Sequence, residues 1–145
     1  YDIKKRADNK SMLVLLDDAG KIASYADVPD IALDLIEVAD KPTTIIYPGA
    51  KRLAPNLIAE DGTIGIRITR EEFTRSLIFR YNKPIVSTSA NISGEPSPHF
   101  FGEISEEIKN AVDYIVDYRR NDHNPAAPSS IIKLGMGGEI QIIRK

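Results

Sequence analysis

The spacing of apolar residues along the chain predicts a series of short strands and helices. Apolar runs of strand length, bounded by turn residues, predict β-strands, whereas apolar residues three and four positions apart predict amphipathic helices. Strands are predicted at residues 12–16, 43–47, 63–69, 84–86, 114–117, 130–134 and 139–143. The last two are joined by a glycine-rich turn, which predicts a hairpin.

Three polar residues mark the predicted starts of helices. Asp27 is placed to cap a helix with Pro29 in its first turn. Residues 69–72 form a capping box that predicts a helix to about Tyr81, and Ser105 is expected to cap a third helix. Strands and helices intermix without strict alternation. The pattern therefore predicts a mixed α/β fold, in which a twisted sheet of parallel and antiparallel strands is flanked by helices.

Residues 63–69 form the clearest of the predicted strands. Its isoleucines share one face, and Gly65 and Arg67 share the other. An arginine beside a glycine suits the floor of a cleft, because glycine leaves room for a ligand. A cross-strand ion pair with a glutamate is an equally good interpretation of Arg67 from this strand alone.

Composition narrows the classes of protein. With 145 residues the chain is long enough for one domain with a real core. It has no cysteine, which excludes disulfides and Cys-ligated zinc and fits a cytoplasmic protein. The two histidines are not at metal-ligand spacing, so no metal site is expected. No apolar run reaches the length of a membrane span.

Charge and the first residue add two expectations. The formal net charge is -2, so contact with tRNA or double-stranded RNA would need a local basic patch. The chain starts at Tyr1 rather than at a methionine, and we expect a segment to precede it. The candidate patch residues are Lys51, Arg52, Arg70, Arg75, Arg80, Arg119 and Arg120.

The densest polar run is residues 87–98, directly after the predicted strand 84–86. It contains five hydroxyl side chains and Asn91. Donors at the end of a buried strand lie where open α/β sheets bind ligands, and an oxyanion or phosphate is the expected partner. The alternative is that these hydroxyls satisfy the backbone of their own loop.

Residues 84–94, Pro-Ile-Val-Ser-Thr-Ser-Ala-Asn-Ile-Ser-Gly, resemble the signature of the YrdC-like family, the threonylcarbamoyl-AMP synthases. Residues 4–6 are similar to the family's Lys-x-Arg, and residues 63–67 to its Val/Ile-Gly-x-Arg strand. Residues 129–132 resemble its Ser-Thr-Ile-Val strand, and residues 142–144 its terminal strand ending in Arg. The resemblance covers the whole chain.

The resemblance implies the YrdC-like fold and an activity. Family members make threonylcarbamoyl-AMP and pyrophosphate from ATP, bicarbonate and L-threonine, for the t6A base at tRNA position 37, with Mg²⁺ carried by the nucleotide. Two alternatives remain open. One is a module of the same fold that binds double-stranded RNA or nucleotide without synthesis, and the other is an inactive carboxyl-terminal fragment.

Site residues follow from the matched motifs. Lys4 and Arg6, two apart on an extended segment, are expected to point the same way and act as catalytic groups that neutralise phosphates. A solvated basic face is the alternative for this pair. Arg67 and Thr88 are expected to contact substrate. The expected nucleotide contacts are Ser87, Ser89, Asn91, Ser129, Ser130 and Arg144, with Ser93 in support.

Two departures weaken the threonine half of the resemblance. The family's Pro-Thr-x-Thr-x-Tyr-Gly segment, which supplies threonine contacts, has no counterpart here, and its Pro-Gly-Pro-x-Thr appears at residues 40–44 without the glycine. The sequence therefore argues better for ATP or AMP than for threonine.

Overall fold

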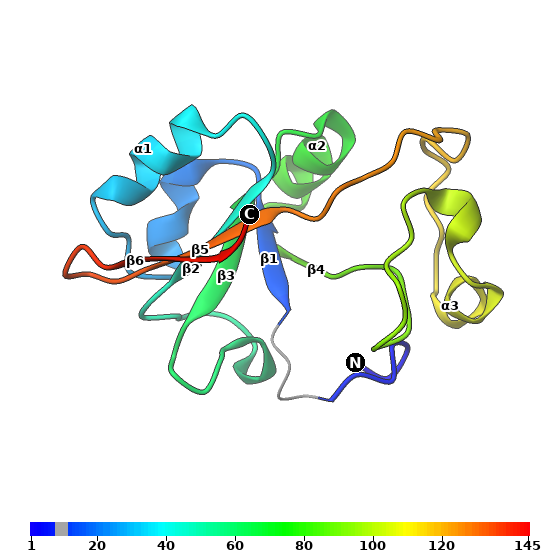
Figure 1. Ribbon diagram of the computed structural model, residues 1–145, viewed down its shortest axis with the longest axis horizontal. Helices are drawn as coiled ribbons and strands as arrows, with labels where there is room; N and C mark the ends of the chain where they lie inside the picture. The colour runs from blue at the N-terminus through cyan, green and yellow to red at the C-terminus, as the bar shows by residue number, and fades with distance from the viewer. Residues whose placement is uncertain (8–11) are drawn as a thin grey trace. The chain divides into compact units, whose positions relative to one another are not determined.

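The structure is a computed structural model that describes residues 1–7 and 12–145 (Figure 1). Its contacts divide the chain into two compact units. The loop unit comprises Tyr1–Lys10 and Thr88–Pro128, and the sheet unit comprises Ser11–Ser87 and Ser129–Lys145. Whether the chain is one domain, as the sequence analysis expects, stays a prediction.

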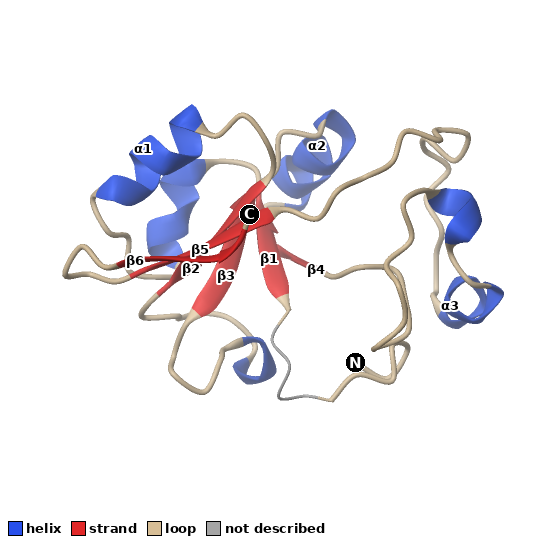
Figure 2. Cartoon of the chain, viewed as in Figure 1, coloured by secondary structure: helices blue, strands red, loops and turns tan. Residues whose placement is uncertain are grey.

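The sheet unit is built on a six-stranded sheet in the order β4-β1-β3-β2-β5-β6 (Figure 2). The β1–β3 and β2–β5 pairs are parallel, and the β1–β4, β2–β3 and β5–β6 pairs are antiparallel. This mixed sheet confirms the predicted fold class. The strands are β1 (Leu13–Leu16), β2 (Thr43–Tyr47), β3 (Ile64–Ile68), β4 (Ile85–Ser87), β5 (Ser130–Leu134) and β6 (Ile140–Arg144).

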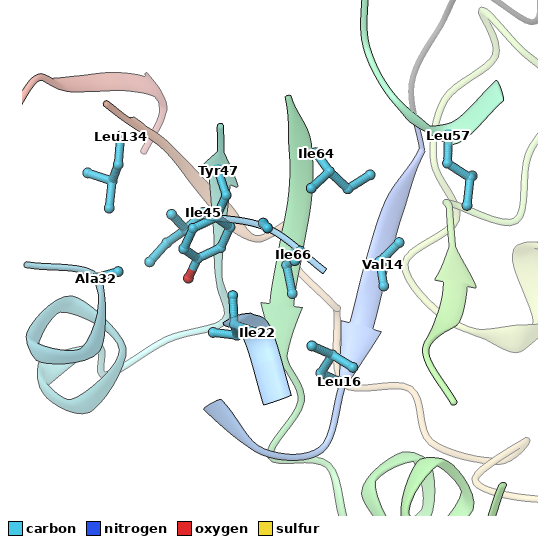
Figure 3. Packing of buried hydrophobic residues seen from close by; sticks show 11 residues of the cluster. Val14, Leu16, Ile22, Ala32, Ile45, Tyr47, Leu57, Ile64, Ile66 and Leu134 are labelled. Atoms are coloured by element: carbon cyan, nitrogen blue, oxygen red, sulfur yellow. The ribbon is translucent and has the colours of Figure 1, made fainter. Parts of the chain in front are cut away.

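One face of the sheet forms the hydrophobic core (Figure 3). Ile64 and Ile66 of β3 lie in this core, and strand alternation therefore puts Gly65 and Arg67 on the opposite face. Helix α1 (Ile31–Val38) contributes Ala32 to it. The other large side chains of this cluster that are fully buried are Val14, Leu16, Ile22, Ile45, Tyr47 and Leu134. The unit also contains the 3-10 helices η1 (Ala19–Ser24) and η2 (Pro55–Leu57).

The helices exist as predicted, but two of their caps are not the predicted residues. Asp27 does not cap α1, because its carboxylate pairs with Lys51 at 3.5 Å and the residue before the helix is Asp30. Helix α2 (Glu72–Tyr81) is capped by Glu71, whose carboxylate accepts from the first-turn backbone N–H groups. The capping-box prediction was therefore wrong in its residues.

The strand that precedes the polar run is not buried, contrary to the sequence analysis. Strand β4 has three residues and lies at the edge of the sheet, where β1 is its one neighbour among the described strands. Val86 is 46% exposed. The apolar run indicates a strand correctly, but burial depends on the neighbours that cover it, and an edge strand has fewer of them.

The loop unit contains η3 (Phe101–Glu103) and α3 (Glu106–Ala111). Ser105 caps α3 as predicted, since its hydroxyl accepts from the Ile108 N–H at 3.3 Å. Residues 114–117 do not form the predicted strand. The Arg120 guanidinium donates to the carbonyls of residues 115 and 116, at 2.8 and 3.1 Å, in place of a neighbouring strand. No helix in the described part of the chain has the length and apolar character needed to cross a bilayer.

Candidate functional site

The Lys-x-Arg motif lies on a tight turn rather than on the extended segment that the sequence analysis predicts. The Lys5 N–H donates to the Asp2 carbonyl and the Arg6 N–H to the Tyr1 carbonyl, both at 3.0 Å. Lys5 adopts a positive φ of 51°, which closes the turn. The turn brings Lys4 to residues 87–98, here called the polar loop, which from Thr88 onwards belong to the same unit.

Lys4 is buried, and its ammonium group lies among oxygens of the polar loop. Its Nζ donates to the Ser89 carbonyl, to the Asn91 carbonyl at 2.6 Å and to the Asn91 side-chain Oδ1 at 3.1 Å. The Ser93 N–H in turn donates to the Lys4 carbonyl at 2.8 Å. The structure thus brings together Lys4, Ser89 and Asn91, which the sequence analysis selected separately.

The surroundings of Lys4 make its charged ammonium form less favourable than in an exposed lysine. Burial, and then the positive charge of Arg6, lower the pKa of the Lys4 ammonium below its usual value. None of the three oxygens that it contacts is a carboxylate. The Lys4 ammonium therefore has no counter-ion among these three contacts, and the positive charge of Arg6 lies close enough to repel it.

The polar loop has many donors that are not used within the protein. In the described residues, no acceptor is found for the backbone N–H groups of residues 89–92 or for the hydroxyls of Ser87, Thr88, Ser89 and Ser93. The alternative in which the hydroxyls satisfy their own backbone is therefore not what the structure shows. Asn91 differs, because its Nδ2 donates to the Glu95 carbonyl at 2.6 Å. Gly94 adopts a positive φ of 91°, as its turn requires.

The sheet unit holds a second group of predicted site residues, around Arg67. The side chain is half-buried, and within residues 1–7 and 12–145 neither an ion pair nor a hydrogen bond is found for it. The glutamate partner considered from the sequence is thus not found. Burial, and then the charge of Arg144, lower the pKa of Arg67. Two guanidinium groups close enough to repel each other favour an anion between or beside them.

Ser129 links Arg144 to the sheet. The Arg144 Nε donates to the Ser129 carbonyl at 2.8 Å, and the Ser129 and Thr44 hydroxyls are hydrogen-bonded at 2.8 Å. Ser130 is paired with Thr43 in the neighbouring strand, and alternation places it on the other face of the sheet. Its buried hydroxyl is the one buried side-chain oxygen or nitrogen without a partner in the described chain.

Thr44 is a site residue that sequence reasoning missed. It is buried in β2 and lies opposite Ile131 in the parallel β2–β5 pair, which puts it on the face of Gly65 and Arg67. A threonine inside an apolar strand was a signal for such a polar contact, but only the register identifies its partner, Ser129.

A pocket of about 340 Å³ lies at the end of β3 in the sheet unit. Arg67 is one of the residues that line it. Arg70 also lines it, but its guanidinium donates to the Ile36 and Ala39 carbonyls at the end of α1, both at 2.8 Å. The remaining lining is mixed, with Ile36, Ala39, Asp40, Lys41, Pro42, Thr43, Ile66, Ile68, Thr69 and Glu71.

Most of the candidate basic patch is used inside the protein. Lys51 pairs with Asp27, Arg119 with Asp122, and Arg120 with Asp117. Arg75 and Arg80 have no partner among the described residues. Both line a hollow of about 650 Å³ along α2, whose other lining residues are Asp17, Asp18, Lys21, Arg70, Glu72, Ser76 and Phe79.

Comparison with known proteins identifies a family model that covers the full chain and a relative that covers most of it. The family model Sua5_yciO_yrdC, described as "Telomere recombination", matches residues 1–145. A protein of Methanocaldococcus jannaschii named putative threonylcarbamoyl-AMP synthase is 38% identical over 135 residues, which is 92% of this chain and 62% of the relative. The chain thus spans about three fifths of the length of this relative.

Solved structures share the fold. Full-length HypF, in a phosphate- and nucleotide-bound crystal form, superposes with a TM-score of 0.81 at 26% identity, over 99% of this chain and 22% of HypF. P. abyssi Sua5 complexed with L-threonine superposes with a TM-score of 0.78 at 22% identity, over 92% of this chain and 39% of Sua5. At that identity the second likeness supports the fold alone.

Proposed function

Since the chain belongs to the Sua5/YciO/YrdC family, we propose that it forms threonylcarbamoyl-AMP and pyrophosphate from ATP, bicarbonate and L-threonine. The relative from M. jannaschii is named for this activity. In this proposal the product serves the t6A base of tRNA, and the nucleotide arrives with Mg²⁺ as its counter-ion. We also propose that both units are parts of one domain and that the protein is cytoplasmic.

The observation that carries the proposal is the set of unused donors in residues 87–93. Four consecutive backbone N–H groups and four hydroxyls have no acceptor in the described chain, and phosphate oxygens are suitable acceptors for all of them. Ser87, Ser89 and Asn91 are proposed nucleotide contacts, and Thr88 a proposed substrate contact. Nucleotide binding by HypF, which shares this fold, agrees with this assignment.

The charged residues supply electrostatic stabilisation. Formation of an acyl-adenylate displaces pyrophosphate from the α-phosphate, so negative charge develops on the leaving group. We propose that the positive charges of Lys4 and Arg6 stabilise the negative charge on the leaving pyrophosphate. Catalysis then consists of positioning and electrostatics, with no acid–base pair assigned.

In the sheet unit, Arg67 and Arg144 are proposed to bind anionic groups. A half-buried guanidinium without a partner suits the carboxylate of an amino acid in a two-point contact. Ser129 and its hydrogen-bonded partner Thr44 fix the position of Arg144. Ser130 stays the weakest nucleotide candidate, since its hydroxyl lies on the other face of the strand from Ser129.

Pyrophosphate release tests the proposed activity. The chain, incubated with ATP, bicarbonate and L-threonine, should release pyrophosphate only when threonine is present. Arg67→Gln should lower the rate about 100-fold, a typical effect of removing a charge-stabilising donor. Lys133→Gln is the control, because Lys133 is a half-buried cation of the sheet unit that already pairs with Asp61, at 2.6 Å. Pyrophosphate release that is independent of threonine would contradict the proposal.

RNA binding is a second candidate function, favoured by Arg75 and Arg80 in the hollow along α2. Two unpaired cations near exposed Phe79 can contact phosphates, whereas Asp17, Asp18 and Glu72 in the same hollow weaken the attraction. The double variant Arg75→Gln, Arg80→Gln should bind a tRNA more weakly, and its tRNA affinity should depend less on salt concentration. Equal affinity of the variant and the parent would exclude this hollow as the contact.

A further inference from the structure

The contacts of Lys4 differ from those of a lysine that binds phosphate. A lysine that binds phosphate directs at least one of its three N–H donors at the ligand. In this protein the Lys4 ammonium has three acceptors already, namely two backbone carbonyls and one amide oxygen of the polar loop. All three belong to residues 89 and 91, 85 and 87 positions away along the chain.

This arrangement separates the acceptors of the loop from its donors. The carbonyls of Ser89 and Asn91 are bound to a cation, whereas the backbone N–H groups of residues 89–92 have no acceptor in the described part of the protein. Carbonyl oxygens repel an anion, and N–H groups attract it. A loop that binds an anion therefore needs its carbonyls held away from the ligand, and a buried ammonium group does this.

We propose that Lys4 is a positioning residue: its ammonium group holds the carbonyls of Ser89 and Asn91 so that the N–H groups of the loop are available to an anionic ligand. The proposal rests on the proposed function of the loop, but it concerns how the loop is held. Asn91 takes part with both ends of its amide, since Oδ1 accepts from Lys4 and Nδ2 donates to the Glu95 carbonyl.

Amide hydrogen exchange of the loop tests this role without any ligand. Lys4→Met keeps the length of the side chain and removes its charge and donors. In the peptide covering residues 88–95, the Ser93 and Glu95 amides donate to the Lys4 and Ile92 carbonyls, and their exchange should become roughly tenfold faster or more, because the charge-assisted hydrogen bonds that hold the loop are lost. Lys5→Met is the matched control, since Lys5 is exposed and pairs with Glu107 at 2.7 Å; it should leave this peptide unchanged. Unchanged exchange in Lys4→Met would overturn the proposal.

A second measurement uses the unchanged protein, and so does not depend on how the variant folds. The pKa of Lys4 is lowered by burial and by Arg6, so its ammonium deprotonates at lower pH than an ordinary lysine. Loop exchange, corrected for its intrinsic dependence on pH, should therefore accelerate as alkaline pH removes this proton. Exchange of β5 should show no such step. The absence of the step in the loop would also contradict the role of Lys4.

Titration with ATP separates this inference from the proposed function. If Lys4 positions the loop, Lys4→Met should weaken ATP binding and also speed loop exchange in the absence of ATP. If Lys4 is only a direct ligand, ATP binding should weaken while loop exchange stays unchanged, which overturns the inference and leaves the proposed function intact. If the unchanged protein does not bind ATP but Lys4→Met still speeds amide exchange of the loop, the positioning role of Lys4 holds and the assignment of the loop to nucleotide binding fails.

Discussion

The sheet unit and the loop unit bury different kinds of group. The sheet unit contains a cluster of eleven buried hydrophobic residues around its strands. In the loop unit, the buried side chains among the described residues are those of Lys4 and Ile108. The sheet unit therefore depends mainly on the hydrophobic effect, and the loop unit on directed polar and cation–π contacts.

The candidate site residues of the two units differ in the same way, since one group lies on a packed strand and the other on a loop held by polar contacts. Arg67 projects from a central strand of the packed sheet, whereas the donors of residues 88–93 belong to a loop held by Lys4. A strand fixes a side chain through its ladder of hydrogen bonds. A loop needs individual contacts to do the same, and each of them can be removed by one substitution.

The largest effect is expected in the sheet core. Ile66→Ala removes a fully buried side chain of β3 and should lower the free energy of unfolding of the sheet unit by about 3 kcal/mol. Urea unfolding followed by circular dichroism measures the change. A loss below about 1 kcal/mol would mean that the core relaxes around the cavity. The sheet unit would then depend less on its buried hydrophobic side chains than we infer.

A smaller and more local effect is expected from Ile108→Ala in α3. The loop unit buries Ile108 alone among its described apolar residues, so the truncation should cost about 2 kcal/mol there. Hydrogen exchange of residues 105–111 should accelerate, while exchange of β1 and β3 stays the same. Equal acceleration in the strands would show that the two units unfold together.

Arg120→Met tests the polar organisation of the loop unit. Arg120 donates to the carbonyls of Ile115 and Val116 and lies 5.2 Å from the centre of the Phe101 ring. Loss of these contacts should cost about 1–2 kcal/mol locally and speed exchange of residues 114–120. Arg119→Met, which removes the exposed pair with Asp122, should have the smaller effect.

The smallest effect concerns acid pH and the sheet surface. Lys133 and Thr63 donate to Asp61 and lower the pKa of its carboxyl to about 2. This stabilisation is present above the ordinary carboxyl pKa of 3.8 and is lost as the pH falls from there towards 2. Because the Asp61 side chain is 51% exposed, the contribution should stay below about 1 kcal/mol. Asp61→Asn should remove this pH dependence from urea unfolding curves, and an unchanged profile would contradict the assignment.

Local patterns predicted most of the elements. The alternation in 63–69 and the serine at position 105 specify β3 and the start of α3 by themselves, because strand faces and N-caps depend on neighbouring residues. The same reasoning failed at residues 114–117. These residues have a strand-like composition, but no described strand pairs with them. The Ile115 and Val116 carbonyls accept hydrogen bonds from Arg120 instead.

The fold class, the β3 face that carries Arg67 and the density of donors in residues 87–98 could all be predicted from residue types and their spacing. Which groups meet depends on how the chain packs: Lys4 contacts Ser89 and Asn91, Ser129 contacts Thr44, and Arg67 lies near Arg144. Residue type and periodicity act over a few positions of the chain. The contacts of Lys4 with Ser89 and Asn91, and of Ser129 with Thr44, each join residues at least 85 positions apart, and only the packed chain brings them together.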